Sequence, residues 1–168
     1  MPWRRYRGGM GMTWVGYRRP ADTARQLLQD PDRVEGLLDS DDGETSLDLD
    51  KAWHGVHWLL TGSADETAHP TSDAILGGEP VGEDLGYGPP RLLSPARVAA
   101  VAGRLAGVGH DDLQARLDPA AMQEAGVYPD IWDEEGVLES TLEPAVDDLR
   151  AFYAAAARAG ECVILTIC

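Results

Sequence analysis

The stretch LDLDKAWHGVHWLLTG, from Leu47 to Gly62, decides how this sequence is interpreted. It holds two of the five tryptophans, two of the four histidines and the only lysine of the chain. Apolar residues at helical spacing predict one short, largely buried helix over residues 50–61. Asp48 or Asp50 would be the N-cap of this helix, and the glycine at position 62 would end it.

The apolar face of the predicted helix is broad. Trp53, Val56 and Leu60 fall on it, and we expect all three side chains to be almost fully buried. Gly55 leaves the opposite side of the helix thin enough for a close neighbour. The sequence therefore predicts a helix at the centre of the fold.

A narrower polar seam runs beside the apolar face and consists of Asp50, His54, His57 and Thr61, whose spacing lets consecutive members touch. Three interpretations remain open. In the structural one, Asp50 caps the helix and orients His54, while the imidazoles bond to backbone or to carboxylates. In the functional one, the seam lines a pocket in which the histidines bind a ligand or move a proton, with Trp58 or Tyr87 as an apolar wall. A metal site is the third interpretation, but HxxH lacks the acidic partner of stronger zinc motifs, so no metal is predicted.

Two further segments supply candidate binding residues. GEDLGYGPP, residues 82–90, could form a rigid lid with Tyr87 at its tip, or an ordinary surface loop. The turn Tyr128-Pro129-Asp130, with Trp132 close behind it, could bring a carboxylate and aromatic rings to the seam, or Asp130 could bond its own backbone. The functional interpretation predicts that the seam shares a cleft with one of these segments.

Composition limits the class of protein. The chain has 168 residues and a formal net charge of −15. This length suits one domain, and the negative charge argues against binding a nucleic-acid backbone. No apolar run approaches the roughly 18 residues of a membrane-spanning helix, so no membrane is expected as a partner. The Asp133–Glu135 and Asp147-Asp148 runs are expected to be solvated faces.

The cysteines and the N-terminus indicate a compartment. Cys162 and Cys168 lie six residues apart in a strand-like segment, too far for a disulfide within one strand. MPWRRYRGGMGM lacks the apolar core of a secretory signal. We therefore expect reduced thiols and a cytoplasmic protein. Residues 1–9 are expected to be a flexible extension, and residues 10–168 a single domain.

The two ends of that domain favour strands. Met12–Arg19 and Cys162–Cys168 are both rich in residues that prefer extended backbone. A helix from about Thr141 to Ala159 precedes the second segment, and Ser94 followed by proline opens another helix. The order predicts an α+β fold, with several helices packed around a small sheet that includes both terminal strands.

Several motifs together resemble a known family. They are residues 47–62, AILGG at 74–78, YGPPRLLSPARV at 87–98, VYPDIW at 127–132, FYAAAARAG at 152–160 and the opening MGMTWVGYRR at 10–19. In this combination the chain resembles the bacterial YfbM-like family over about residues 10–168. The resemblance implies a compact α+β fold and a bacterial cytoplasmic setting. It implies no activity, because the family is one of unknown function.

Two classes of function follow. The first is a non-catalytic binding or interaction module, whose pocket or acidic face recognises a partner protein or a small polar ligand; the absence of any P-loop, GxGxxG, CxxC or GxSxG motif favours it. The second is a small hydrolase-like or transferase-like enzyme that uses His54 or His57 with Asp50 or Asp130. Neither class calls for a cofactor. Solvent access to the imidazole nitrogens distinguishes the two.

Overall fold

A five-stranded antiparallel sheet lies at the centre of the computed structural model, which describes residues 11–40, 43–65 and 67–168. In sheet order the strands are β2 (Ser46–Asp50), β1 (Trp14–Arg19), β5 (Cys162–Ile167), β4 (Arg91–Leu93) and β3 (Glu79–Pro80). The two terminal strands pair directly, in a register from Trp14 opposite Ile167 to Arg19 opposite Cys162. The predicted sheet of both termini is thus confirmed. The expected extension at residues 1–9 lies outside the described residues.

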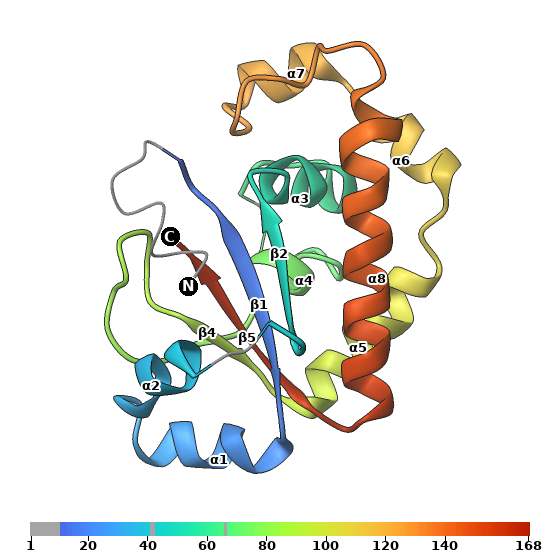
Figure 1. The fold of residues 1–168 in the computed structure, drawn as a ribbon. Coiled ribbons are helices and arrows are strands. Elements are labelled where there is room, and N and C mark those ends of the chain that lie inside the picture. The colour runs from blue at the N-terminus through green and yellow to red at the C-terminus, as the bar shows by residue number, and fades with distance from the viewer. Residues whose placement is uncertain (1–10, 41–42, 66) are drawn as a thin grey trace.

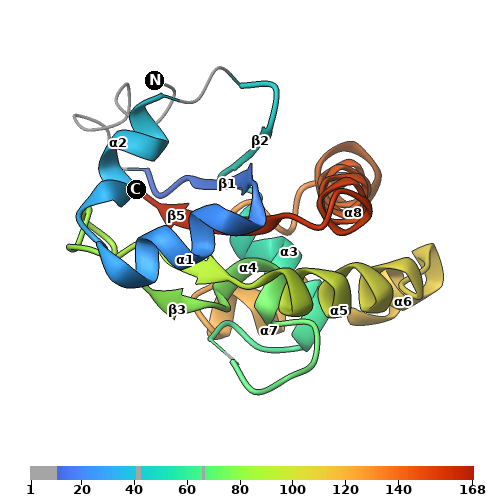
Figure 2. The ribbon, with the colours of Figure 1, turned by 90° about the horizontal axis from the view of Figure 1, so that it is seen from below.

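Helices cover both faces of this sheet (Figures 1 and 2). They are α1 (Ala21–Gln29), α2 (Arg33–Asp39), α3 (Trp53–Thr61), α4 (Asp73–Leu76), α5 (Pro95–Ala106), α6 (His110–Arg116), α7 (Pro119–Glu124), a π-helical turn η2 (Leu138–Leu142), and α8 (Glu143–Arg158). In both views α1 and α2 lie on one side, away from α5 and α8. None of these described helices has the length and apolar character needed to cross a membrane.

The burial of β5 shows why its sequence is apolar almost throughout. Cys162 and Ile164 belong to a smaller core with residues of α1 and α2. Val163 and Leu165 belong to the main core, which α3, α5 and α8 line. Because successive side chains of a strand point to opposite faces, a strand covered on both sides needs apolar residues at every position.

Two helix predictions hold with small changes. The Ser94 hydroxyl accepts a hydrogen bond from the Arg97 amide at 3.3 Å, so Ser94 is the predicted cap of α5. The last helix, expected from about Thr141, begins at Glu143 and is preceded by the π-helical turn.

One prediction about the central motif is wrong. Residues up to Asp50 are not helical: β2 runs through Leu49 to Asp50, and α3 begins only at Trp53. Asp50 ends the strand with a positive φ of 49°, and Ala52 precedes the helix without a side-chain cap. The reason is visible in the alternation of Leu and Asp from position 47 to 50, which is a period of two and not a helical one. Leu49 is buried, while Asp48 and Asp50 are exposed.

The other expectations for this motif are confirmed. Trp53, Val56 and Leu60 are at most 5% exposed. Gly62 has a left-handed backbone, with φ of 75°, and its amide donates to the Trp58 carbonyl at 2.7 Å, which ends α3. Such a conformation is costly for any residue with a Cβ, so the glycine fits its place as a helix stop.

Candidate functional site

His54 on α3 bonds to backbone through both of its ring nitrogens. Its Nδ1 accepts a hydrogen bond from the Tyr128 amide at 2.9 Å, and Nε2 lies 2.8 Å from the Ala64 carbonyl oxygen. An amide can only donate and a carbonyl can only accept, so the imidazole is neutral with its proton on Nε2. Burial is the main cause that lowers the pKa of His54 below its usual 6.5, against a smaller opposing effect of the Ala64 carbonyl.

An aromatic stack holds the His54 ring in place. The rings of Trp53 and His54 are 4.6 Å apart and nearly parallel, at 9°. The Trp53 indole donates to the Met12 carbonyl at 3.1 Å, while the Met12 amide donates to the Tyr128 hydroxyl at 3.3 Å. These contacts tie the start of β1, the helix α3 and the turn at residue 128 into one unit.

The remaining helical members of the seam also make internal contacts. His57 is completely buried. The Thr61 hydroxyl donates toward the His57 carbonyl at 2.9 Å, a bond within the last turn of α3. The Trp58 indole donates to the Arg116 carbonyl at 3.0 Å, and the Arg116 guanidinium donates back to the carbonyls at the end of α3. The Thr61 bond lies within α3, and the contacts with Arg116 pack α3 against the end of α6.

The structure separates Asp50 from the helical part of the seam. Asp50 stands at the end of β2, in register with Trp14 of β1, and its amide donates to the Asp48 carboxylate at 2.7 Å. It is therefore neither the cap of α3 nor a member of its polar arc, because the helix begins three residues later than predicted.

Tyr87 lies at a different place. Its side chain is 53% exposed and lines a cavity of about 50 Å³. The other lining residues are Ile75, Leu76, Gly88, Pro89, Arg91, Leu165, Thr166 and Ile167, and none of them belongs to the seam. Within the loop, the Asp84 carboxylate accepts from the amides of Gly86 and Gly88 at 2.6 and 3.1 Å. The cavity beside Tyr87 is therefore not a cleft shared with His54.

The turn after Gly126 does reach the seam, but through backbone. The Tyr128 amide bonds to His54, as described, while Asp130 is exposed to solvent. In the described ranges no three His, Cys, Asp or Glu side chains are grouped closely enough to hold a metal ion. The arrangement around His54 thus links secondary-structure elements and presents no acid–base pair to solvent.

The relatives of this chain can now be named. A sequence model of the family described as Domain of unknown function (DUF1877) matches residues 10–166. The chain belongs to the DUF1877 family. The resemblance predicted from the motifs is confirmed by a second match, to Protein YfbM of Escherichia coli (strain K12). The two sequences are 29% identical over 168 aligned residues, which cover 94% of this chain and 99% of the relative.

The fold is shared as well. The crystal structure of YfbM from Escherichia coli, a protein of unknown function, matches with a TM-score of 0.74. The match covers 93% of this chain and 99% of the other, at 23% sequence identity. This chain and YfbM therefore share a fold, and neither match carries an activity.

The sequence analysis of this DUF1877 chain missed a concentration of charge. Residues 111–149 contain 12 of the 29 acidic residues and one of the 14 basic residues, Arg116. That segment therefore has a net charge of −11, and the rest of the chain −4. Eleven of the 12 carboxylates are exposed; only Glu143 is half-buried. A comparison of net charge between segments of the sequence, and not over the whole chain, would have found this acidic segment.

The half-buried Glu143 has a histidine partner. His110 Nδ1 lies 2.8 Å from the Glu143 carboxylate and joins the start of α6 to the start of α8. The hydrogen bond to Glu143 is the main cause that raises the pKa of His110, and the charges of Glu143, Asp111 and Glu139 act in the same direction. The pKa values of His54 and His110 are therefore shifted in opposite directions.

Replacing His54 by glutamine should lower the free energy of unfolding by about 1 kcal/mol at pH 8, a usual cost for a disturbed internal hydrogen bond. The lowered pKa means that the folded protein binds fewer protons at His54 than the unfolded chain does. The stabilisation that His54 contributes is therefore complete above 6.5, its pKa in the unfolded chain. It is lost as the pH falls toward the pKa of His54 in the folded protein. Urea unfolding of wild type and variant at pH 8, 6.5 and 5 measures this difference in the free energy of unfolding.

His110→Gln is the matched control for this prediction. The raised pKa of His110 gives a stabilisation that is present below pH 6.5 and is lost as the pH rises through the folded pKa. The difference from wild type should therefore shrink with rising pH for His110→Gln and with falling pH for His54→Gln. The same direction of change in both variants would contradict the assignment of the neutral His54 tautomer.

Proposed function

We propose that this DUF1877 chain is a non-catalytic binding module of the bacterial cytoplasm, which recognises a basic segment of a partner protein. The observation that carries the proposal is the acidic segment of residues 111–149, which contains eleven exposed carboxylates and a single arginine. A surface of one sign attracts partners of the other sign and steers their association.

The arginine in that segment does little to offset the surface. The Arg116 guanidinium donates to the carbonyls of Leu59 and Leu60, at 3.1 and 2.6 Å, at the end of α3. Arg150, just beyond the segment, donates to the carbonyls of Leu105 and Val108 at the end of α5, and also to the Asp147 carboxylate at 2.6 Å. Both side chains are directed to the ends of helices, which a positive charge stabilises. Among the described residues, Asp147 is the one exposed carboxylate of the segment with an arginine partner, so the other ten exposed carboxylates leave the segment strongly negative.

The geometry of the histidines does not favour the enzyme alternative. A general acid or base must reach the proton that it transfers, directly or through one water. His54 already bonds to backbone at both nitrogens, and His57 is completely buried. Asp50 stands on β2, apart from the arc of α3. A binding role needs none of these groups to be free.

The described cavities are small, the largest of those named here being about 230 Å³, and this favours a protein partner over a small polar ligand. The space beside Tyr87 is about 50 Å³, and a groove beside Trp132 is about 180 Å³. Pockets that enclose a drug-sized molecule have roughly 300–1,000 Å³. Spaces of this size suit single side chains that a partner protein inserts.

Binding of fluorescein-labelled peptides to the full chain tests the proposal by fluorescence anisotropy. An arginine-rich peptide should bind, a glutamate-rich peptide of the same length should not, and the affinity for the first should fall by about tenfold or more between low salt and about 0.5 M salt. Equal affinity for both peptides, or affinity independent of salt, would overturn the proposal. Turnover of a compound from a metabolite panel would overturn its non-catalytic part.

A further inference from the structure

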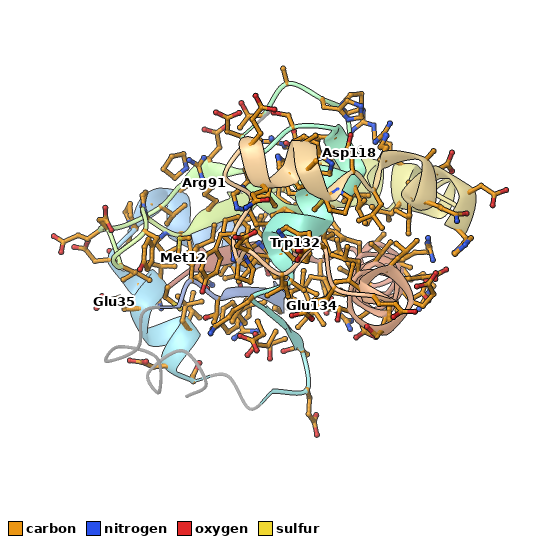
Figure 3. All side chains as sticks on the ribbon, turned by 90° about the horizontal axis from the view of Figure 1, so that it is seen from above. Met12, Glu35, Arg91, Asp118, Trp132 and Glu134 are labelled. Carbon is orange, nitrogen blue, oxygen red and sulfur yellow. The ribbon has the colours of Figure 1, made fainter. Side chains whose placement is uncertain are left out.

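A groove of about 180 Å³ opens at the junction between α6 and α7, within the acidic segment. Two stretches line it, the junction itself and residues 132–139. The lining residues are Gln114, Leu117, Pro119, Trp132, Asp133, Glu134, Gly136, Val137, Leu138 and Glu139. Figure 3 looks down on this end of the molecule, where the labelled Trp132, Glu134 and Asp118 lie.

The floor of the groove is apolar and rigid. Leu117 and Pro119 are half-buried, and Val137 is 4% exposed. The floor therefore consists of apolar side chains that are packed on one side and partly open to solvent on the other. The Trp132 ring is held in place by a hydrogen bond, because its indole donates to the Val127 carbonyl at 2.9 Å. A preformed floor can bind an apolar side chain without first having to become ordered.

The rim of the groove is negatively charged. Asp133, Glu134 and Glu139 are exposed carboxylates, and the residues described in the lining include no lysine, arginine or histidine. A negative rim around an apolar floor repels acidic molecules, including nucleic acids. It matches an apolar side chain whose neighbours are arginine or lysine, since the rim can pair with those charges while the floor takes the apolar group.

We infer that this groove is the docking site for the basic segment of a partner protein, and that one apolar side chain of the segment occupies its floor. The inference rests on the proposed function and names its place. Carboxylates alone do not distinguish the site. A second acidic pocket, of about 230 Å³, is lined by Asp32, Glu35 and Glu83 with Val34 and Gly82, and Val34 is its one large apolar side chain.

That second pocket provides a matched control. The test variant is D133N/E134Q/E139Q at the groove, and the control variant is D32N/E35Q/E83Q near α2. Each changes three exposed carboxylates and moves the net charge from −15 to −12. The probe is a fluorescein-labelled arginine-rich peptide with one central leucine, and circular dichroism melting checks that both variants are folded.

The groove variant should bind this peptide about tenfold more weakly than wild type, and the control variant less than about threefold more weakly. A peptide with alanine in place of the leucine should also bind more weakly to wild type, because it lacks the apolar side chain that the floor takes. An equal loss of affinity in the two protein variants would overturn the groove as the docking site. Binding would then depend on negative charge in general and not on this groove. No binding of either peptide to wild type would overturn both proposals. Equal affinity of the two peptides would overturn the apolar floor as a binding element.

Discussion

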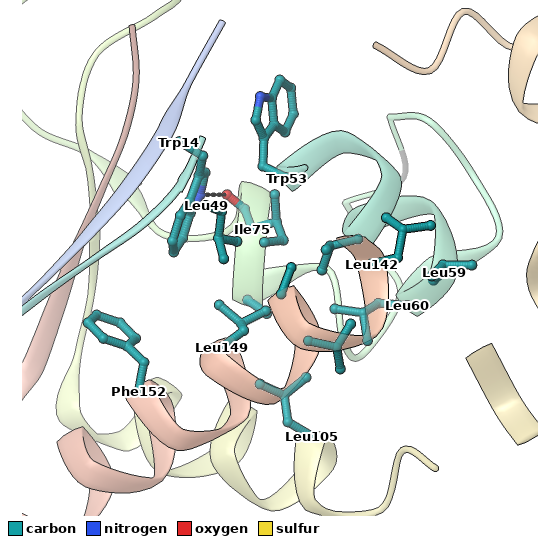
Figure 4. Close-up of a cluster of buried hydrophobic side chains, with 14 of the residues drawn as sticks. Trp14, Leu49, Trp53, Leu59, Leu60, Ile75, Leu105, Leu142, Leu149 and Phe152 are labelled. Atoms are coloured by element: carbon teal, nitrogen blue, oxygen red, sulfur yellow. Dashed lines mark hydrogen bonds between the residues drawn. The ribbon is translucent and has the colours of Figure 1, made fainter. Parts of the chain in front are cut away.

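Trp14→Ala should lower the free energy of unfolding by about 3–5 kcal/mol, the usual range for a large aromatic side chain removed from a core. Trp14 lies on β1, between the two strands that flank it in the sheet, and is completely buried. Its indole also donates to the Ile75 carbonyl at 3.0 Å, which joins the sheet to α4 (Figure 4). Urea unfolding followed by circular dichroism measures the loss.

A second substitution separates the two contributions of this side chain. Trp14→Phe keeps most of the apolar area but leaves the Ile75 carbonyl without its indole donor. It should cost about 1–3 kcal/mol, the range for a buried polar group that loses its partner. If alanine and phenylalanine both cost less than about 1 kcal/mol, Trp14 would not be the centre of this core.

The parts of the fold that the sequence predicts are those with a local signal. The terminal strands have residues that favour extended backbone, and Ser94-Pro95 opens α5 with a capping side chain. The predicted start of the central helix at residue 50 is wrong because it places Asp50 in the helical arc of residues 50–61, whereas Asp50 ends strand β2. The alternation of Leu47–Asp50 is also local, and it favours the strand that is observed.

The partners of the seam could not be predicted in the same way. His54 bonds to Ala64, ten residues away, and to Tyr128, 74 residues away. Both partner groups are backbone atoms, which every residue has, so no residue type in the sequence marks them. A polar residue on an apolar helix predicts that a partner exists. It does not say whether the partner is a ligand or the chain itself, and here the helix packs against the turn at Tyr128.

Gly55 shows that a residue type can predict a tertiary contact. The glycine indicated a close neighbour behind α3, and Trp132 is that neighbour. A Cβ at Gly55 would lie 2.6 Å from the Trp132 ring and 2.8 Å from a Leu142 methyl group. Both distances are shorter than real Cβ contacts allow, so Trp132 and Leu142 would have to move. The glycine is therefore required by packing, although it weakens the helix in isolation.

Gly55→Ala should for this reason destabilise the protein by about 1–3 kcal/mol, the usual cost of overpacking a core. Alanine is the better helix former, so the intrinsic propensity acts in the opposite direction. Gly103 in α5 provides the control, because nothing lies within 4 Å of a Cβ built there. Gly103→Ala should stabilise the protein by about 0.4–1 kcal/mol, through the reduced freedom of the unfolded chain.

Thermal and urea unfolding of the two variants should therefore change in opposite directions. Gly55→Ala in a Trp132→Phe background extends the test, because phenylalanine lacks the ring atoms that a Cβ at residue 55 would meet. The cost of the alanine should be smaller there than in wild type, which is a coupling that only residues in contact produce. An unchanged cost in that background would show that the helix itself, and not the tryptophan behind it, requires the glycine. Movement of Trp132 would also disturb the floor of the acidic groove, so Gly55→Ala should weaken peptide binding while Gly103→Ala leaves it unchanged.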